Sequence, residues 1–118
     1  MAKIPEIVIA AWAKKKGAPV MTTVDKDGMP NSVYTTCVSI YEGEKILVAN
    51  NFFNKTFANI KDGGKGTFLF LTEDDKAYQI KGTYTHYTEG AMFEDMKKWN
   101  PTRLPGVGVA ALEVEEIY

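Results

Sequence analysis

Short β-type stretches joined by brief turns constrain the fold of this chain more than any other feature. The clearest turn is Asp25-Lys26-Asp27-Gly28, which separates a run ending at Val24 from a long run that begins near Asn31. An Asp-Gly pair between two such runs is a strong hairpin signal. Short strands at this spacing favour a closed or partly closed antiparallel barrel over a fold of alternating strands and helices.

Six strands and three helices are predicted along the chain. The strands cover residues 19–24, 31–41, 46–49, 66–72, 77–87 and 107–116. The helices cover residues 4–16, 55–61 and 89–99. Gly82, inside the fifth strand, predicts a bulge or a tight bend of the kind that a barrel corner uses. The fold is therefore predicted to be mainly β.

The first helix has a start signal, a stop signal and an apolar stripe. Pro5 fits the first turn of a helix, and Gly17 is expected to end it. The lysines at 14–16 would then lie at the helix C-terminus, where cations interact favourably with the helix dipole. Apolar residues at helical spacing predict the buried side, and they are Ile4, Ile7, Val8, Ala11 and Trp12.

Composition excludes several function classes. The chain has 118 residues, of which 45% are hydrophobic and 25% charged, as expected for one globular domain spanning residues 1–118. A net charge of -1 argues against a nucleic-acid partner, and no apolar run approaches the roughly 20 residues that would span a membrane. The single cysteine, Cys37, excludes an internal disulfide, and the N-terminus does not resemble a signal peptide. We therefore expect a cytoplasmic protein.

The start of the second helix is the strongest candidate for a binding site. It follows an aromatic loop and carries Asn54, Lys55 and Thr56. A helix N-terminus offers unpaired N–H groups and a partial positive charge, so an adjacent ammonium and hydroxyl complete a receptor for phosphate. The helix is expected to end at Asp62-Gly63-Gly64. The simpler alternative is that Asn54 only caps the helix and Lys55 only contacts water.

Other candidate chemistry is weak. His86 is the only histidine, whereas a catalytic zinc site normally needs three protein ligands, so no metal site is predicted. Cys37 and His86 could in principle pair as nucleophile and base, but no sequence signature for activation accompanies them. No catalytic residue is assigned from the sequence.

The order and spacing of several motifs resemble the FMN-binding split-barrel family, which includes pyridoxamine 5'-phosphate oxidases and small bacterial FMN-binding proteins. The similarity extends from Pro19 to Ile117. The motifs that carry it are Asp27-Gly28-Met29-Pro30, residues 33–38, Val48-Ala49-Asn50, Asn54-Lys55-Thr56 with Asn59, and Lys81-Gly82-Thr83 leading to Thr88-Glu89-Gly90. The resemblance implies a six-stranded antiparallel split β-barrel of the Greek-key type.

The resemblance also implies an FMN site and the residues that form it. Residues along the flavin would be Val33, Tyr34, Thr35 and Thr36, followed by Val48 and Ala49 on the next strand and Asn50 at the corner. The FMN phosphate would be bound by Lys55 and Thr56, with Asn54 closing the site. Members of the family form homodimers with the flavin between the subunits, which would give exposed aromatic residues a role. The aromatic residues expected there are Phe52, Phe53, Trp99 and Tyr118.

The chain also departs from the family pattern. Full-length pyridoxamine phosphate oxidases have an arginine beside the phosphate lysine and another at the start of the flavin strand, where this chain has Asn54 and Val33. The only arginine is Arg103. FMN binding tolerates these changes better than vitamin B6 oxidation does. With no arginine expected near the phosphate, we predict a weaker phosphate contact, so that FMN can be lost on purification or at high salt.

The sequence therefore predicts an FMN flavoprotein, either an oxidoreductase or an electron carrier, with a small molecule or a protein as its redox partner. Two alternatives remain open. One is a non-catalytic module that carries a flavin or another phosphorylated ligand. The other is a protein of the same fold that binds a deazaflavin or haem, with His86 as the available axial ligand for haem.

Overall fold

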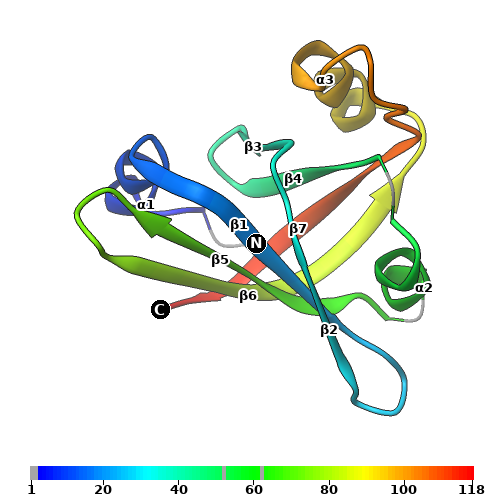
Figure 1. Ribbon diagram of the computed structural model, residues 1–118, viewed down its shortest axis with the longest axis horizontal. Helices are drawn as coiled ribbons and strands as arrows, with labels where there is room; N and C mark the ends of the chain where they lie inside the picture. The colour runs from blue at the N-terminus through cyan, green and yellow to red at the C-terminus, as the bar shows by residue number, and fades with distance from the viewer. Residues whose placement is uncertain (1–2, 52, 62) are drawn as a thin grey trace.

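The fold is a curled antiparallel sheet accompanied by three helices (Figure 1). The computed structural model describes residues 3–51, 53–61 and 63–118. Within these ranges the seven strands are β1 (Lys15–Val24), β2 (Pro30–Tyr34), β3 (Val38–Tyr41), β4 (Lys45–Asn50), β5 (Lys65–Thr72), β6 (Ala77–Tyr87) and β7 (Gly108–Ile117). The helices are α1 (Glu6–Trp12), α2 (Lys55–Lys61) and α3 (Ala91–Trp99). The predicted mainly β split-barrel fold is confirmed.

The two edges of the sheet are formed by strands that follow one another in the sequence. The strand order is β2-β1-β5-β6-β7-β4-β3, so β2 and β3 lie at opposite edges. Figure 1 shows the chain crossing between them in front of β1. Thr35 anchors this crossover to β1, because its backbone N–H and its hydroxyl both donate to the Pro19 carbonyl, at 2.8 and 3.0 Å. On the other side, the Cys37 carbonyl accepts from the Ala49 N–H of β4 at 3.0 Å.

The prediction of six strands was wrong by one strand. The single strand expected over residues 31–41 is two strands, separated at residues 35–37. The β1–β2 ladder ends at the Val20–Tyr34 pair, and the β3–β4 ladder begins at the Val38–Val48 pair. The crossover contains no glycine or proline, so its sequence carries no local signal of a break.

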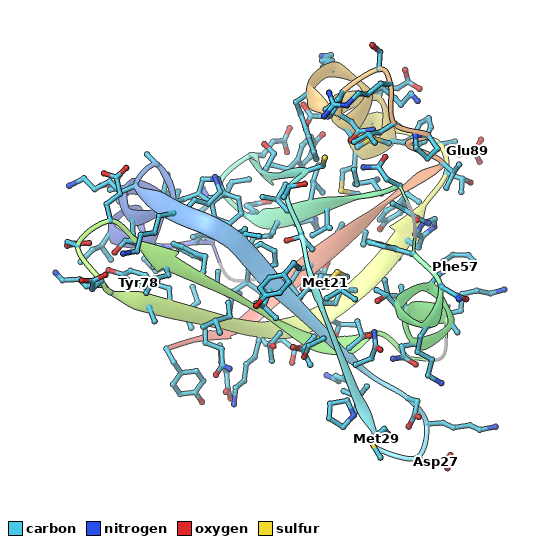
Figure 2. All side chains as sticks on the ribbon, in the orientation of Figure 1. Met21, Asp27, Met29, Phe57, Tyr78 and Glu89 are labelled. Carbon is cyan, nitrogen blue, oxygen red and sulfur yellow. The ribbon has the colours of Figure 1, made fainter. Side chains whose placement is uncertain are left out.

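The core lies inside the curl of the sheet and extends to α1. Its largest buried side chains include Met21, near the centre of Figure 2, with Phe68 and Phe70. Trp12 of α1 stacks on Phe68, at a centroid distance of 5.5 Å, and meets Phe70 edge-on at 5.3 Å. A second apolar cluster joins Met96 of α3 to β4 and β7. Both β4 and β7 are therefore covered on two faces.

The first helix is shorter than predicted. It ends at Trp12, and Lys15 already pairs with Thr72 of β5. Gly17 does not end a helix; it lies within β1 at a φ of +70°, where the register with β5 shifts. Ile7, expected on the buried side, is 70% exposed. A helix of this length is marginal on its own, so strand pairing with β5 determines the conformation of the lysine segment.

The lysines of that segment do not cap a helix. The Lys15 ammonium lies 4.6 Å from the centroid of the Trp12 ring, and Lys16 forms an ion pair with Asp75 at 2.6 Å. Lys15 and Lys16 are therefore side chains of β1 and contact neighbouring elements. None of the described helices is long and apolar enough to cross a membrane.

One predicted turn and one predicted bulge are confirmed, and part of the predicted end of α2 lies outside the described residues. In the β1–β2 hairpin, Gly28 has a φ of +84° and its N–H donates to the Asp25 carbonyl at 3.0 Å. The bulge expected at Gly82 appears as a register shift between β6 and β7. At the exit of α2, Gly63 and Gly64 have φ values of +121° and +72°, whereas Asp62 lies outside the described residues.

We predict that Gly82→Ala destabilises the fold. A Cβ at this position would lie 1.9 Å from the Glu113 carbonyl oxygen, so β6 and β7 would have to separate. Overpacking of this kind costs about 1–3 kcal/mol or more. Urea denaturation followed by circular dichroism measures the loss, with Thr85→Ala, an exposed position on β6, as the control. Equal stability of the two variants would contradict the prediction.

Candidate functional site

One pocket gathers most of the residues that the resemblance assigned to FMN. Its volume is about 600 Å³, within the usual range for small-molecule sites. All but one of the assigned residues line it: Val33, Tyr34, Thr35 and Thr36 from the end of β2 and the crossover, Val48 and Ala49 from β4, and Asn54, Lys55 and Thr56 from the start of α2. Their role in binding FMN stays a prediction.

Asn50, the remaining assigned residue, lies at the corner behind the pocket. Its side chain is buried, and its Oδ1 accepts the Phe53 N–H at 3.0 Å. Its Nδ2 lies 2.9 Å from His86 Nε2 on β6, and its carbonyl accepts the Val107 N–H at 3.0 Å. Asn50 therefore ties the loop before α2 to β6 and to the start of β7.

His86 is held as a neutral imidazole. Because Asn50 Oδ1 is engaged by a backbone donor, Asn50 Nδ2 faces His86 Nε2 as a donor, so Nε2 must be the acceptor. Phe57 of α2, labelled in Figure 2, meets the ring edge-on at 4.7 Å. Burial lowers the pKa of His86, and the donor at Nε2 acts in the same direction.

Lys55 is the first residue of α2, and its side chain extends toward the β1–β2 hairpin. Its ammonium is 3.7 Å from Asp25 Oδ2, and its side chain is more than half exposed. Asp25 Oδ1 accepts the N–H groups of Met29 and Asp27, both at 2.9 Å and both at the hairpin tip in Figure 2. The Met29 N–H, followed by the Asp27 N–H and the Lys55 ammonium, lowers the pKa of the Asp25 carboxyl. The hairpin thus supplies an ionised partner that orients Lys55.

The threonine hydroxyls of the pocket have different capacities for a ligand. The Thr35 hydroxyl already donates to Pro19, so it can only accept. The Thr56 hydroxyl accepts from Asn31 Nδ2 at 3.2 Å, which leaves its own hydrogen available to an anion. Thr36 is exposed at the pocket wall.

Arg103 is the main site residue that sequence reasoning missed. It lines the same pocket as Lys55, together with its neighbour Leu104. The expectation that no arginine lies near the pocket was therefore wrong. The loop returns there because β4 pairs with β7 in a register that sets Asn50 opposite Gly108. Arg103 could have been assigned to the pocket only if this long-range pairing of β4 with β7 had been known.

The pocket is suited to an anion with an apolar body. Its described lining contains two cations, Lys55 and Arg103, and no carboxylate. Apolar walls come from both β strands and the loops, for example Val33, Val48 and Leu104. Among the residues in view, no cluster of three or more His, Cys, Asp or Glu side chains could hold a metal ion.

The fold, together with a comparison of the sequence with known families, identifies the family to which this chain belongs. The sequence profile of the pyridoxamine 5'-phosphate oxidase family matches residues 6–118, and the chain belongs to that family. It is 33% identical over 103 residues to the uncharacterized protein MJ0282 of Methanocaldococcus jannaschii, which covers 83% of this chain and 69% of that protein.

Solved structures agree with this assignment. HupZ of Group A Streptococcus superposes with a TM-score of 0.79 at 27% identity, covering 96% of this chain and 90% of that one. An FMN-binding protein of Syntrophomonas wolfei gives 0.76 at 24% identity, covering 98% and 82%. An F420 reductase and HutZ, the haem storage protein of Vibrio cholerae, share the fold at 14% and 13% identity. These last three similarities show the fold alone.

We predict a pH dependence of stability that depends on His86. Since burial lowers its pKa in the folded state, the unfolded chain binds the proton first. The free energy of unfolding should therefore fall as the pH drops through about 6.5, the usual histidine value, and level off below the folded-state pKa. Urea midpoints between about pH 7 and 5.5 measure this change.

His86→Gln is the matched variant for this test. A glutamine carbonyl can accept from Asn50 Nδ2 and does not titrate, and the chain has no other histidine. The variant should lose the fall in stability near neutral pH, whereas Thr85→Ala should keep it. An unchanged pH profile in His86→Gln would contradict the assignment.

Proposed function

We propose that this protein is a flavoprotein that binds FMN in the pocket beside α2 and acts as an oxidoreductase or an electron carrier. The observation that carries the proposal is the pocket itself: Lys55 and Arg103 provide positive charge, its described lining contains no carboxylate, and Asp25, the ion-pair partner of Lys55, lies outside that lining. Membership of the pyridoxamine 5'-phosphate oxidase family and the fold of an FMN-binding protein support the same ligand.

The residues present fit the two halves of FMN. The phosphate carries about −1.5 to −2 charge near neutral pH, and a charge-assisted hydrogen bond contributes about 1.5–3 kcal/mol. Lys55 and the hydroxyl of Thr56 would hold this group, because both line the pocket and the Thr56 hydrogen is available. Apolar contacts from Val48 and Ala49 would cover part of the ring.

Bound FMN would supply the redox chemistry. The chain's own residues would bind and orient the cofactor. Asp25 orients Lys55, and the Thr35 bonds to Pro19 hold the crossover wall in place. We assign no general acid or base, so the proposal leaves the reaction class as oxidation–reduction with a small-molecule or protein partner.

The same geometry argues against haem ligation by His86. Its Nε2 is engaged by Asn50 at 2.9 Å, and His86 is not among the lining residues of the pocket. An axial ligand needs that nitrogen directed at the iron. A deazaflavin or a non-catalytic carrier role would use the same pocket, and bleaching of the bound flavin by NADH or NADPH separates a carrier from a reductase.

We also propose that the protein forms a homodimer with the flavin near the interface. Tyr34 lines the pocket while remaining 81% exposed, and Leu69 and Leu71 expose apolar surface on β5. A second copy would cover such groups. Of the aromatic residues expected at the interface, Tyr118 is exposed, Phe53 and Trp99 are half-buried, and Phe52 lies outside the described residues. The lone thiol of Cys37 supports a cytoplasmic location.

Sedimentation of the purified protein with FMN tests the dimer. We expect a two-chain species whose dissociation on dilution releases flavin, because the ligand would contact both copies. Flavin binding that stays equally tight in a monomer would contradict an interfacial site.

Lys55→Ala should weaken FMN binding about tenfold or more, because one charge-assisted contact to the phosphate is lost. Quenching of flavin fluorescence measures the dissociation constant. Riboflavin, which lacks the phosphate, should bind this variant and the original protein equally. Lys61→Ala, at the other end of α2, is the control with the same loss of charge.

The binding experiment and a separate bleaching test decide the proposal. Failure of the original protein to bind FMN would overturn the proposed function. Equal FMN binding by the Lys55→Ala and Lys61→Ala proteins would overturn the site assignment. If NADH or NADPH bleaches the bound flavin, the protein is a reductase; if only a chemical reductant does so, the electron-carrier form of the proposal holds.

A further inference from the structure

The loop between α3 and β7 is fastened to the pocket corner by a reciprocal pair of amides. Asn51 Nδ2 donates to Asn100 Oδ1 at 3.0 Å, and Asn100 Nδ2 donates to Asn51 Oδ1 at 3.0 Å. Asn51 Oδ1 also accepts the Gly106 N–H at 2.9 Å. Asn100 is buried, so these bonds are shielded from competing water.

Further contacts hold both ends of this loop. The Val107 N–H donates to the Asn50 carbonyl at 3.0 Å, and the Leu104 N–H closes a turn on the Pro101 carbonyl at 3.0 Å. Gly106 has a φ of +49°, and a Cβ there would lie 2.8 Å from Asn100 Nδ2. The loop is therefore closely packed at its base, while Arg103 and Leu104 between its ends face the pocket.

The two cations of the pocket differ in their protein partners. Lys55 is paired with Asp25, whereas Arg103 takes part in none of the ion pairs found among the described residues. Its side chain is exposed at the pocket wall. A guanidinium in this situation can offer its planar set of N–H donors to a phosphate in a bidentate arrangement.

We propose that Arg103 is the second cationic contact for the phosphate of the ligand, and that Asn51 and Asn100 are the positioning residues that hold its loop at the pocket. The proposal rests on the proposed function, because FMN provides the phosphate. It identifies a phosphate-binding residue on the loop between α3 and β7, far from Lys55 in the sequence.

Arg103→Ala tests the contact directly. We expect FMN to bind about tenfold or more weakly and riboflavin to bind within about twofold of the original protein, since only FMN carries the phosphate. The FMN dissociation constant should also depend less steeply on salt, because one charge pair has been removed. Arg103→Lys keeps the charge and should retain part of the affinity. Lys98→Ala, an exposed position on α3 outside the pocket lining, controls for net charge.

A double-mutant cycle tests the positioning role. Asn100→Ala should weaken FMN binding several-fold when Arg103 is present and should add no loss in the Arg103→Ala background. Amide exchange at Gly106 should accelerate in the Asn100 variant, because the Asn51 side chain that accepts from it loses its partner. Asn100→Gln, which adds no charge near the phosphate, replaces the alanine variant if that protein does not fold.

The results separate this inference from the proposed function. If the original protein binds FMN and Lys55→Ala weakens binding, but Arg103→Ala behaves like Lys98→Ala, the inference is overturned and the proposed function stands. Equal losses of affinity for FMN and riboflavin in Arg103→Ala would also overturn it, because the residue would then contact the part that both ligands share and not the phosphate. Additive losses in the cycle would overturn the positioning role. No binding of FMN by the original protein would remove both proposals.

Discussion

The two hydrogen bonds from Thr35 to the Pro19 carbonyl are the interaction on which the rest of the architecture depends. The backbone bond of this pair continues the β1–β2 register by one residue, and from there the chain runs to the opposite edge of the sheet, where Cys37 pairs with Ala49. The barrel is split for this reason, since the two edge strands are joined by chain and not by a ladder. The same crossover forms one wall of the pocket, so the break in the sheet and the binding site share one structural cause.

Those parts of the fold that arise from local chemistry could be predicted from the sequence. The turn at Gly28 depends on a backbone conformation that few residues other than glycine adopt, and the bulge at Gly82 brings Glu113 so close that no Cβ fits. The break near Thr35 could not be predicted, because it depends on long-range pairing: the residues before it pair with β1 and those after it pair with β4. The early end of the first helix has a similar origin: the lysine segment that could have continued the helix pairs with β5.

The residues of the candidate site also fall into two groups, those that could be predicted from the sequence and those that could not. Its contiguous part, from Val48 to Thr56, was visible in the sequence because strand, corner and helix start follow one another directly. Arg103 was not, because its position depends on the pairing of β4 with β7 and on the Asn51–Asn100 bonds. A single sequence shows which residues are suited to an anion, but only the long-range register shows which of them meet.

The two adjacent asparagines at the corner explain how such a site can be rigid without opposing its own ligand. Successive residues of an extended chain project to opposite sides, so Asn50 reaches His86 while Asn51 reaches Asn100 and Gly106. Both networks are built from amides and a neutral imidazole, which satisfy buried polar groups without adding net charge. Carboxylates in these places could not donate the bonds that these Nδ2 groups make, and they would also repel a phosphate. The neutral corner therefore leaves the charge of the pocket to Lys55 and Arg103, the two groups able to attract an anion.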